Sequence, residues 1–161
     1  MTGSSFPVPR GLLGSEYAVA RTSLPGIITG DNVGAHKWKE TTQALKEMLE
    51  EGGRIKVDVT STPSKDLTDE NLAKYDVLVL NYRDTPGGAP ESRWSDTNKD
   101  AFLKAVRGGK GLAVYHWASS AFAKPNWEEF EKAVAGGWRS QGFHGPPHAF
   151  TVKACAGPWP P

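Results

Sequence analysis

The sequence predicts a doubly wound α/β domain, a flavodoxin-like three-layer sandwich built on a parallel sheet with strand order 2-1-3-4. Short apolar runs near residues 27–29, 76–80 and 111–114 alternate with stretches in which apolar residues recur at helical spacing. The run at 76–80 lacks polar alternation, which is typical of a central parallel strand covered on both faces. Strands and helices that alternate in this way imply right-handed crossovers and a parallel sheet.

The expected elements, in chain order, are a strand at 27–29, a helix at 36–51, a strand at 54–60, a helix at 67–74, a strand at 76–80, a helix at 95–107, a strand at 111–115, a helix starting near 126 and a fifth strand at 150–152. Pro25 and Gly26 stand where a longer first strand would run, and both residue types weaken strands. Gly52 and Gly53 end the first helix. The strand at 54–60 alternates apolar and polar residues, so we place it near the sheet edge.

Capping residues mark the starts of three later helices. Thr68 is placed to cap the helix at 67–74, and Ser95 caps the next helix, which Gly108 and Gly109 end. Asn126, with Glu129 three residues further on, has the spacing of a capping box for the helix that follows. These signals fix where the helices begin, and therefore where the strands between them lie.

Length and charge restrict the class of protein. The chain has 161 residues and a formal net charge of +1, so it fits one globular domain and shows no basic stripe for nucleic acid. Its single cysteine, Cys155, cannot form an intrachain disulfide and fits a reducing compartment. No stretch has the length of a membrane span. We therefore expect a cytoplasmic, soluble protein with no nucleic-acid or membrane partner.

Polar side chains gather where the predicted strands end. They are Asp31 and Asn32 after the first strand, Asn81, Tyr82, Arg83 and Asp84 after the strand at 76–80, and His116 and Trp117 after the strand at 111–115. Because the carboxyl ends of parallel strands share one edge, these side chains are expected to line one crevice. Local alternatives are that Asp31 and Asn32 only stabilise their turn, that Arg83 and Asp84 pair with each other, and that Trp38 and Trp127 pack in the core.

Four histidines bear on the chemistry: His36, His116, His144 and His148. None forms a local metal motif, but three of their segments converge on the crevice, and an open site of three histidines is a common catalytic zinc arrangement. The alternative is that each histidine bonds nearby backbone, and His148 is expected to face solvent. The turn at His116 resembles a nucleophile elbow, yet it carries histidine in place of cysteine or serine, so covalent acyl transfer is not expected.

Motifs at four places in order resemble the ThuA-like (trehalose utilisation) family. They are His36-Lys-Trp38 with Thr41, Tyr75-Asp76, Gly109-Lys-Gly111 leading to Tyr115-His116-Trp117, and Gly136-Gly-Trp138 followed by Gly142-Phe-His144-Gly-Pro146. The resemblance implies a class I glutamine amidotransferase-like fold without the catalytic cysteine, and a role in bacterial metabolism of trehalose, related disaccharides or 3-keto sugars. It also implies functional roles for His36, His116 and His144. The expected division is an irregular extension at 1–23, the ThuA-like domain at 24–153, incomplete at its C-terminal end, and a tail at 154–161.

Two classes of function follow. In the first, His36, His116 and His144 form a centre, holding a divalent metal such as zinc or none, that polarises a sugar carbonyl or activates water, with Asp31 or Asp84 as proton carrier. A sugar hydrolase, lyase or isomerase would fit, and a glutaminase would not. Asn32, Asn81, Tyr82, Arg83, Asp84 and Trp117 would then bind a small-molecule sugar. In the second, the chain is a non-catalytic sugar-binding or regulatory module. Homo-oligomers are compatible with either function.

Overall fold

A computed structural model of the protein describes residues 24–30, 36–84, 93–122, 126–137 and 145–152. Four parallel strands form its sheet: β1 (Pro25–Gly30), β2 (Asp58–Thr60), β3 (Val77–Tyr82) and β4 (Gly111–Val114), in the order β2-β1-β3-β4. The predicted α/β class and the predicted order 2-1-3-4 are both confirmed. The two longest strands, β1 and β3, form the centre of the sheet.

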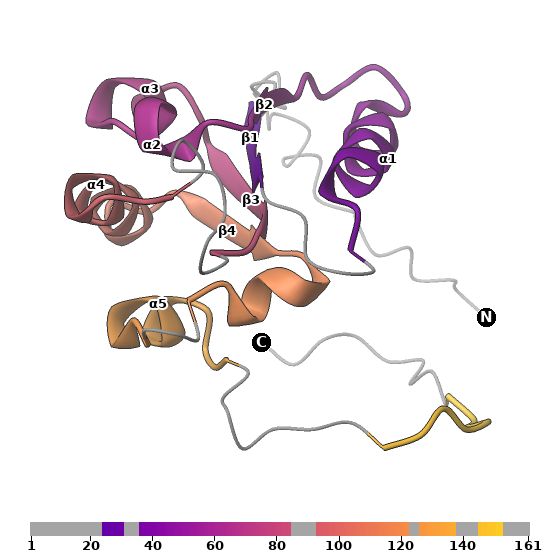
Figure 1. The fold of residues 1–161 in the computed structure, drawn as a ribbon. Coiled ribbons are helices and arrows are strands. Elements are labelled where there is room, and N and C mark those ends of the chain that lie inside the picture. Colours follow the sequence, from indigo (N-terminus) through magenta and orange to yellow (C-terminus); the bar gives the residue numbers. More distant parts are fainter. Residues whose placement is uncertain (1–23, 31–35, 85–92, 123–125, 138–144, 153–161) are drawn as a thin grey trace, which may run out of the picture.

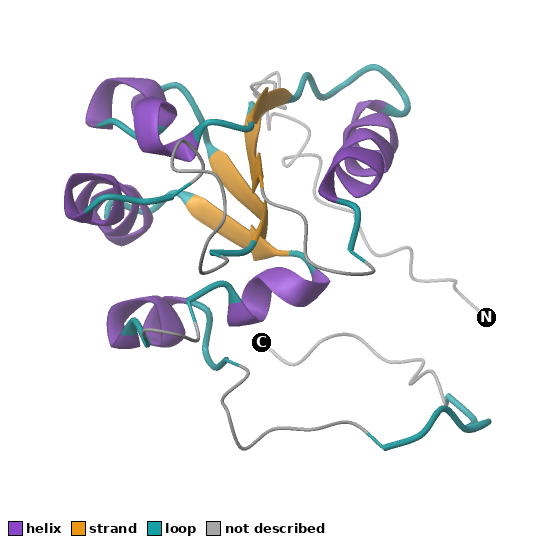
Figure 2. Ribbon diagram, in the orientation of Figure 1, coloured by secondary structure: helices purple, strands orange, loops and turns teal. Residues whose placement is uncertain are grey.

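Helices cover both faces of this sheet (Figures 1 and 2). One face carries α1 (Trp38–Glu50), and the other side carries α2 (Pro63–Asp66), α3 (Asp69–Ala73), α4 (Asp96–Arg107) and α5 (Glu128–Ala133). A 3₁₀ helix, η2 (His116–Ser120), follows β4 directly. None of the helices in the described segments is long and apolar enough to span a membrane.

The central strands supply alternate side chains to two separate cores. Ile28, Leu78 and Leu80 face the side of α4 and α5, where Phe102 and Phe130 are fully buried with them. Ile27 and Val79 face the side of α1 and belong to a smaller cluster. This division explains why the run in β3 has no polar alternation: both of its faces are covered, as predicted.

Two strand boundaries differ from the predicted ones at the start of the sheet. β1 begins at Pro25, because the first position of a strand tolerates proline. Gly26 lies inside the strand, and a Cβ atom there would stand 2.9 Å from the ring of Tyr75. Glycine is therefore required at this position for close packing. β2 is an edge strand as predicted, but it is shorter than the expected strand at 54–60.

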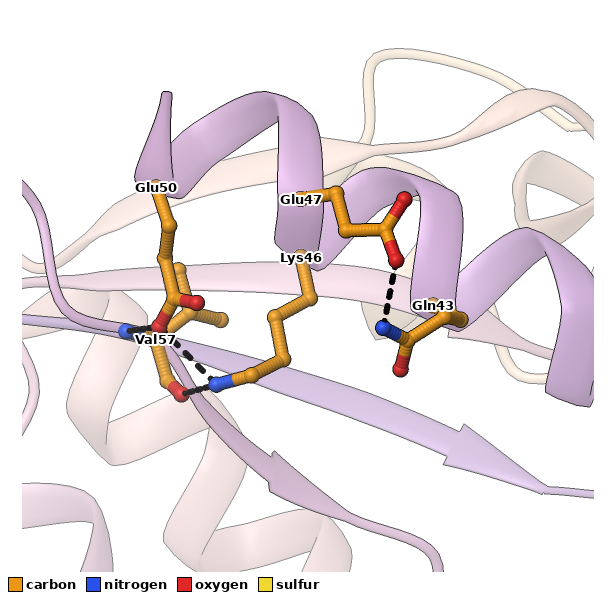
Figure 3. A network of polar contacts seen from close by, with 5 residues as sticks. All are labelled: Gln43, Lys46, Glu47, Glu50 and Val57. Carbon is orange, nitrogen blue, oxygen red and sulfur yellow. Dashed lines mark hydrogen bonds and ion pairs between the residues drawn. The ribbon is translucent and has the colours of Figure 1, made fainter. Parts of the chain in front are cut away.

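A polar network ties the end of α1 to the beginning of β2 (Figure 3). Lys46 Nζ donates to Glu50 Oε1 at 2.9 Å and to the carbonyl of Val57 at 2.7 Å. Glu50 Oε1 in turn accepts from the Val57 backbone N–H at 3.0 Å. Both backbone polar groups of Val57 are thus bonded by side chains of α1, which fixes the edge strand relative to the helix.

Helix starts are predicted correctly where the cap is local. Thr68 accepts from the Asn71 N–H, and Ser95 forms a capping box with Asn98. The predicted box of Asn126 and Glu129 is wrong: α5 begins at Glu128 without a side-chain cap, and the Glu129 carboxylate instead pairs with Arg107 and Lys132. Tertiary ion pairing has replaced the local cap.

The predicted fifth strand at 150–152 is also wrong. This segment is irregular, and Phe150 and Val152 are each 77% exposed, so it adds no strand to the sheet. A short helix that the sequence reading missed, α2, precedes α3, with Pro63 at its first position. Proline suits that position because the first N–H of a helix needs no partner inside it.

Candidate active site at the carboxyl edge of the sheet

A hollow of about 30 Å³ lies at the carboxyl edge of β1 and β3, beside η2. Its lining residues are Gly30, His36, Trp38, Thr41, Asn81, Tyr82, Arg83, Tyr115, His116, Trp117 and Ala118. A cavity of roughly 10–15 Å³ already holds one water molecule, so this hollow is small. The hollow described by these residues therefore admits one small polar group, and any larger ligand must extend outside it.

Two predicted histidines from separate segments of the chain meet at this hollow. His36 stands just before α1, and His116 is the first residue of η2 after β4. Their ring centroids are 5.0 Å apart. The convergence that topology predicted for these two residues is confirmed by their positions, although eighty residues separate them in sequence.

His116 has a backbone conformation that is uncommon outside glycine. Its φ is +45°, in the left-handed region, at the step from β4 into η2. The hydroxyl of Ser119 donates to the His116 carbonyl at 3.1 Å and so supports this turn. Strain of this kind persists where surrounding structure enforces it and gathers at functional sites. With this turn, the imidazole lines the hollow at the carboxyl edge.

The ring of Trp117 lies near both a histidine and the guanidinium of Arg83. Its ring centroid lies 4.1 Å from that of His36, and the guanidinium of Arg83 lies 5.1 Å from the Trp117 ring. The Trp117 residue is 38% exposed. An indole held on polar neighbours and open to solvent offers an apolar surface at the mouth of the hollow.

Arg83 is anchored through one nitrogen. Its Nη1 donates to the Ser120 carbonyl at 3.0 Å and to the Ser120 hydroxyl at 2.9 Å. Burial lowers the pKa of Arg83, and the charge of Asp84 acts in the opposite direction. No contact within 4.0 Å joins the charged atoms of Arg83 and Asp84, so the alternative in which these two residues pair is wrong. Asp84 instead accepts from the hydroxyl of Tyr82 at 2.9 Å.

Asn81 and Tyr82 are placed differently from the sequence expectation, because β3 continues through both of them. Asn81 Nδ2 donates to Thr41 Oγ1 at 3.0 Å and to Thr42 Oγ1 at 2.9 Å. Tyr82 is 2% exposed and packs in the aromatic core. The amide nitrogen of Asn81 therefore holds α1 in place, and the side chain of Tyr82 mainly forms part of the wall of the hollow.

The other predicted site residues fall into two groups. Asp31, Asn32 and His144 lie outside the described residues, and with them the third histidine of the predicted centre. His148 is exposed, as expected, and its Nδ1 lies 3.2 Å from the Pro146 carbonyl. Within the described segments, no group of three or more His, Cys, Asp or Glu residues is arranged to hold a metal ion.

Five lining residues were not predicted from the sequence, and three of them, Trp38, Thr41 and Tyr115, have a polar or aromatic side chain. Trp38 lines the hollow, although core packing was favoured for it, and Thr41 and Tyr115 were not singled out as site residues. Position carries the relevant signal: Trp38 follows His36 by two residues, Thr41 lies one helical turn beyond Trp38, and Tyr115 precedes His116. Residues three apart on a helix share one face, so Thr41 reaches the same side as Trp38, whereas the adjacent pair Tyr115 and His116 is brought together by the turn and not by periodicity.

Comparisons with known proteins agree with this fold. A family model described as ThuA, trehalose utilisation, matches residues 27–157. A ThuA-like protein from Parabacteroides merdae has a similar solved structure, with a TM-score of 0.58 and 32% sequence identity, over 73% of this chain and 40% of that one. A ThuA-like protein from Bacteroides uniformis shares the fold with a TM-score of 0.55 and 23% identity, over 74% of this chain and 46% of that one. The chain thus spans less than half the length of either structure. Among curated proteins, none matches the sequence.

Proposed function

The chain belongs to the ThuA (trehalose utilisation) family, and from that premise we propose that it acts in carbohydrate metabolism by binding a sugar at this hollow and transforming it through His36 and His116. Trehalose, a related disaccharide or a 3-keto derivative is the substrate class. The observation that carries the proposal is the pair of imidazoles, 5.0 Å apart between centroids, against the half-exposed ring of Trp117.

The aromatic residues at the mouth support a sugar ligand. Trp117 is 38% and Tyr115 is 43% exposed, and both line the hollow. Binding sites combine such apolar faces with a few polar groups that set the orientation of the ligand. A sugar ring stacked on Trp117 would direct one of its oxygens into the small hollow, toward the histidines.

The histidine pair would supply proton transfer. Imidazole both accepts and donates protons near neutral pH, so one histidine can act as general base while the other acts as general acid. On a keto sugar, removal of a proton beside the carbonyl and protonation of an oxygen would lead to elimination or isomerisation. Activation of water would lead to hydrolysis. These three reaction classes make up the proposed activity.

A divalent metal such as zinc is an alternative form of the proposal, in which the histidines hold the metal and do not themselves transfer protons. Two imidazoles bound to one tetrahedral zinc, with Zn–N distances near 2.0–2.1 Å, place their ring centroids roughly 5 Å apart. The separation of 5.0 Å between His36 and His116 fits that arrangement. His144 is the proposed third ligand. When bound, the metal would polarise a carbonyl or a water molecule.

Turnover of trehalose and of 3-keto sugars by His116→Ala tests the function, with His148→Ala as the matched control because His148 is exposed and absent from the hollow lining. Loss of a general acid or base reduces turnover by about 10²–10⁴-fold. We expect a decrease of that size for His116→Ala, unchanged folding by circular dichroism, and unchanged turnover for His148→Ala. Full activity of His116→Ala would refute the assignment.

Metal content per chain, measured by elemental mass spectrometry on tag-free protein, tests the proposed ion. We expect near-stoichiometric zinc or another divalent metal, which falls in His116→Ala and stays in His148→Ala. A folded, active protein without metal would instead assign the chemistry to the histidines themselves.

A non-catalytic sugar-binding module is the second candidate. It is favoured by one observation: no carboxylate of the described residues lines the hollow, so the partner that many acid–base sites use is not among them. Saturable sugar binding without turnover, in this chain and in a full-length relative, would support the module. Turnover would exclude it.

A further inference from the structure

The hollow is rich in groups that favour negative charge. His36, His116 and Arg83 line it, and the described residues contribute no carboxylate to the lining. The charge of Asp84 acts to raise the pKa of Arg83. The Asp84 carboxylate accepts a hydrogen bond from the hydroxyl of Tyr82 and makes no ion pair with the guanidinium. Arg83 is the permanent cation among the described lining residues, and a neutral ligand would bring no opposite charge to it.

Arg83 is held so that part of its guanidinium stays available. Nη1 is engaged by Ser120, while Nη2 and Nε form no hydrogen bond with any residue that the structure describes. Arginine has five N–H donors in a rigid fork that matches a carboxylate or a phosphate. The ring of Trp117, 5.1 Å from the guanidinium carbon, limits the freedom of that fork.

Partial burial makes an anion the preferred partner of Arg83. A cation that has lost part of its water without gaining an ion pair is compensated when an oxyanion binds, because charge-assisted hydrogen bonds are stronger than neutral ones. Burial lowers the pKa of Arg83 more than the nearby charge of Asp84 raises it, so Arg83 loses more from burial than Asp84 returns. The hollow of about 30 Å³ admits a group of carboxylate size, with a sugar ring left on Trp117 outside it.

We infer that this site selects sugars that carry an oxyanion, held by Arg83 beside the His36–His116 pair, and that a sugar acid is therefore a better ligand than its neutral counterpart. The inference rests on the proposed sugar function, which it deepens. A carboxylate, as in a uronate, and a phosphate ester share this chemistry. The small hollow favours the carboxylate.

The test uses the full chain and two matched pairs of probes. Calorimetric titration compares glucuronate with glucose and adds glucose 6-phosphate as the phosphate ester. In a second measurement, acetate and its uncharged analogue acetamide are titrated while the indole N–H resonance of Trp117 is followed by NMR. The acetate pair tests the oxyanion site without a sugar, so it separates the two proposals.

Variants at Arg83 test whether any preference for a charged ligand depends on that residue. Arg83→Gln removes the charge, Arg83→Lys keeps the charge and removes the fork, and Arg54→Gln is the control because Arg54 is exposed in the loop after α1. A hydrogen bond to a charged group contributes about tenfold or more in affinity. We expect glucuronate to bind at least about tenfold more tightly than glucose. Arg83→Gln should abolish this preference, Arg83→Lys should reduce it, and Arg54→Gln should keep it.

The outcomes separate the two proposals. Tighter binding of glucose 6-phosphate than of glucuronate would support the oxyanion site and identify phosphate as its source. Equal binding of glucose and both acids, with no acetate response, would overturn the inference and leave the proposed sugar function intact. An acetate response without binding of any sugar would support the oxyanion site and count against the sugar function. If Arg83→Gln fails to fold, the comparison of charged and neutral probes on the wild-type chain still decides whether the site prefers an oxyanion.

Discussion

The two ends of α1 are attached to the sheet by different kinds of polar contact. At the first turns, next to the site, the contacts are uncharged and largely buried: Thr29 Oγ1 lies 2.9 Å from Thr42 Oγ1 and donates to the Asn81 carbonyl, and Asn81 Nδ2 donates to Thr42. At the last turns the contacts are charged. Lys46 and Glu50 bond Val57 there, and each of their side chains is one-third exposed (Figure 3).

The difference shows how one helix can serve a site at one end and an edge strand at the other. A buried uncharged network is costly to leave unsatisfied, so it fixes geometry closely. Exposed ion pairs are screened by water and contribute little. The rigid attachment lies where His36 and Trp38 must be positioned, and the weaker one holds β2, which carries no site residue.

Removal of the central amide should have the largest effect. Asn81→Leu leaves the hydroxyls of Thr41 and Thr42 without their donor. We expect a loss of about 2–3 kcal/mol in the free energy of unfolding, measured with urea. Asn126→Leu is the control, because Asn126 is exposed before α5. Equal losses in the two variants would show that the network does not fix this end of α1.

A double-mutant cycle at Thr29 and Thr42 should give an intermediate effect. Thr29→Val and Thr42→Val each remove one partner of a buried hydroxyl pair and are expected to cost about 1–2 kcal/mol. The double variant should cost less than the sum, by at least about 0.5 kcal/mol, since no hydroxyl of this pair is left unpaired. Strict additivity in thermal or urea unfolding would contradict the coupling.

The charged end should give the smallest effect, and a pH-dependent one. The hydrogen bond from Lys46, together with the Val57 N–H, lowers the pKa of Glu50 below its ordinary value of 4.5. A carboxylate with a lowered folded-state pKa stabilises the fold above its unfolded pKa, and this contribution is lost as the pH falls through the folded value. The melting temperatures of wild type and Glu50→Gln should therefore differ most near neutral pH and converge in acid.

Gln43→Ala is the control for this end of the helix. Gln43 Nε2 donates to Glu47 at 2.7 Å on the exposed surface and does not contact Val57 (Figure 3). We expect a change within about 0.5 kcal/mol at every pH, as for other surface substitutions. A pH-independent difference for Glu50→Gln, equal to that for Gln43→Ala, would remove the special role of Glu50.

Patterns that act within a few residues, combined with the rule that parallel crossovers are right-handed, were sufficient to predict the strand order. The apolar run in β3 indicated a strand covered on both faces, and Thr68 and Ser95 marked helix starts that the structure confirms. Prediction failed where a distant partner intervened. Arg107 of α4 takes Glu129 away from a local cap, and the ring of Tyr75 packs against Gly26 inside β1.

The candidate site divides in the same way. The sequence by itself determined that His36 lies before a helix and that His116 follows a strand. The parallel topology that it predicted sends such residues to one edge of the sheet. Only the tertiary structure decided that the two rings lie 5.0 Å apart, that Arg83 bonds Ser120 and not Asp84, and that Asn81 supports α1. The physical reason is range: periodicity and capping depend on neighbours along the chain, whereas side-chain contacts depend on the distances that packing sets between segments far apart in sequence.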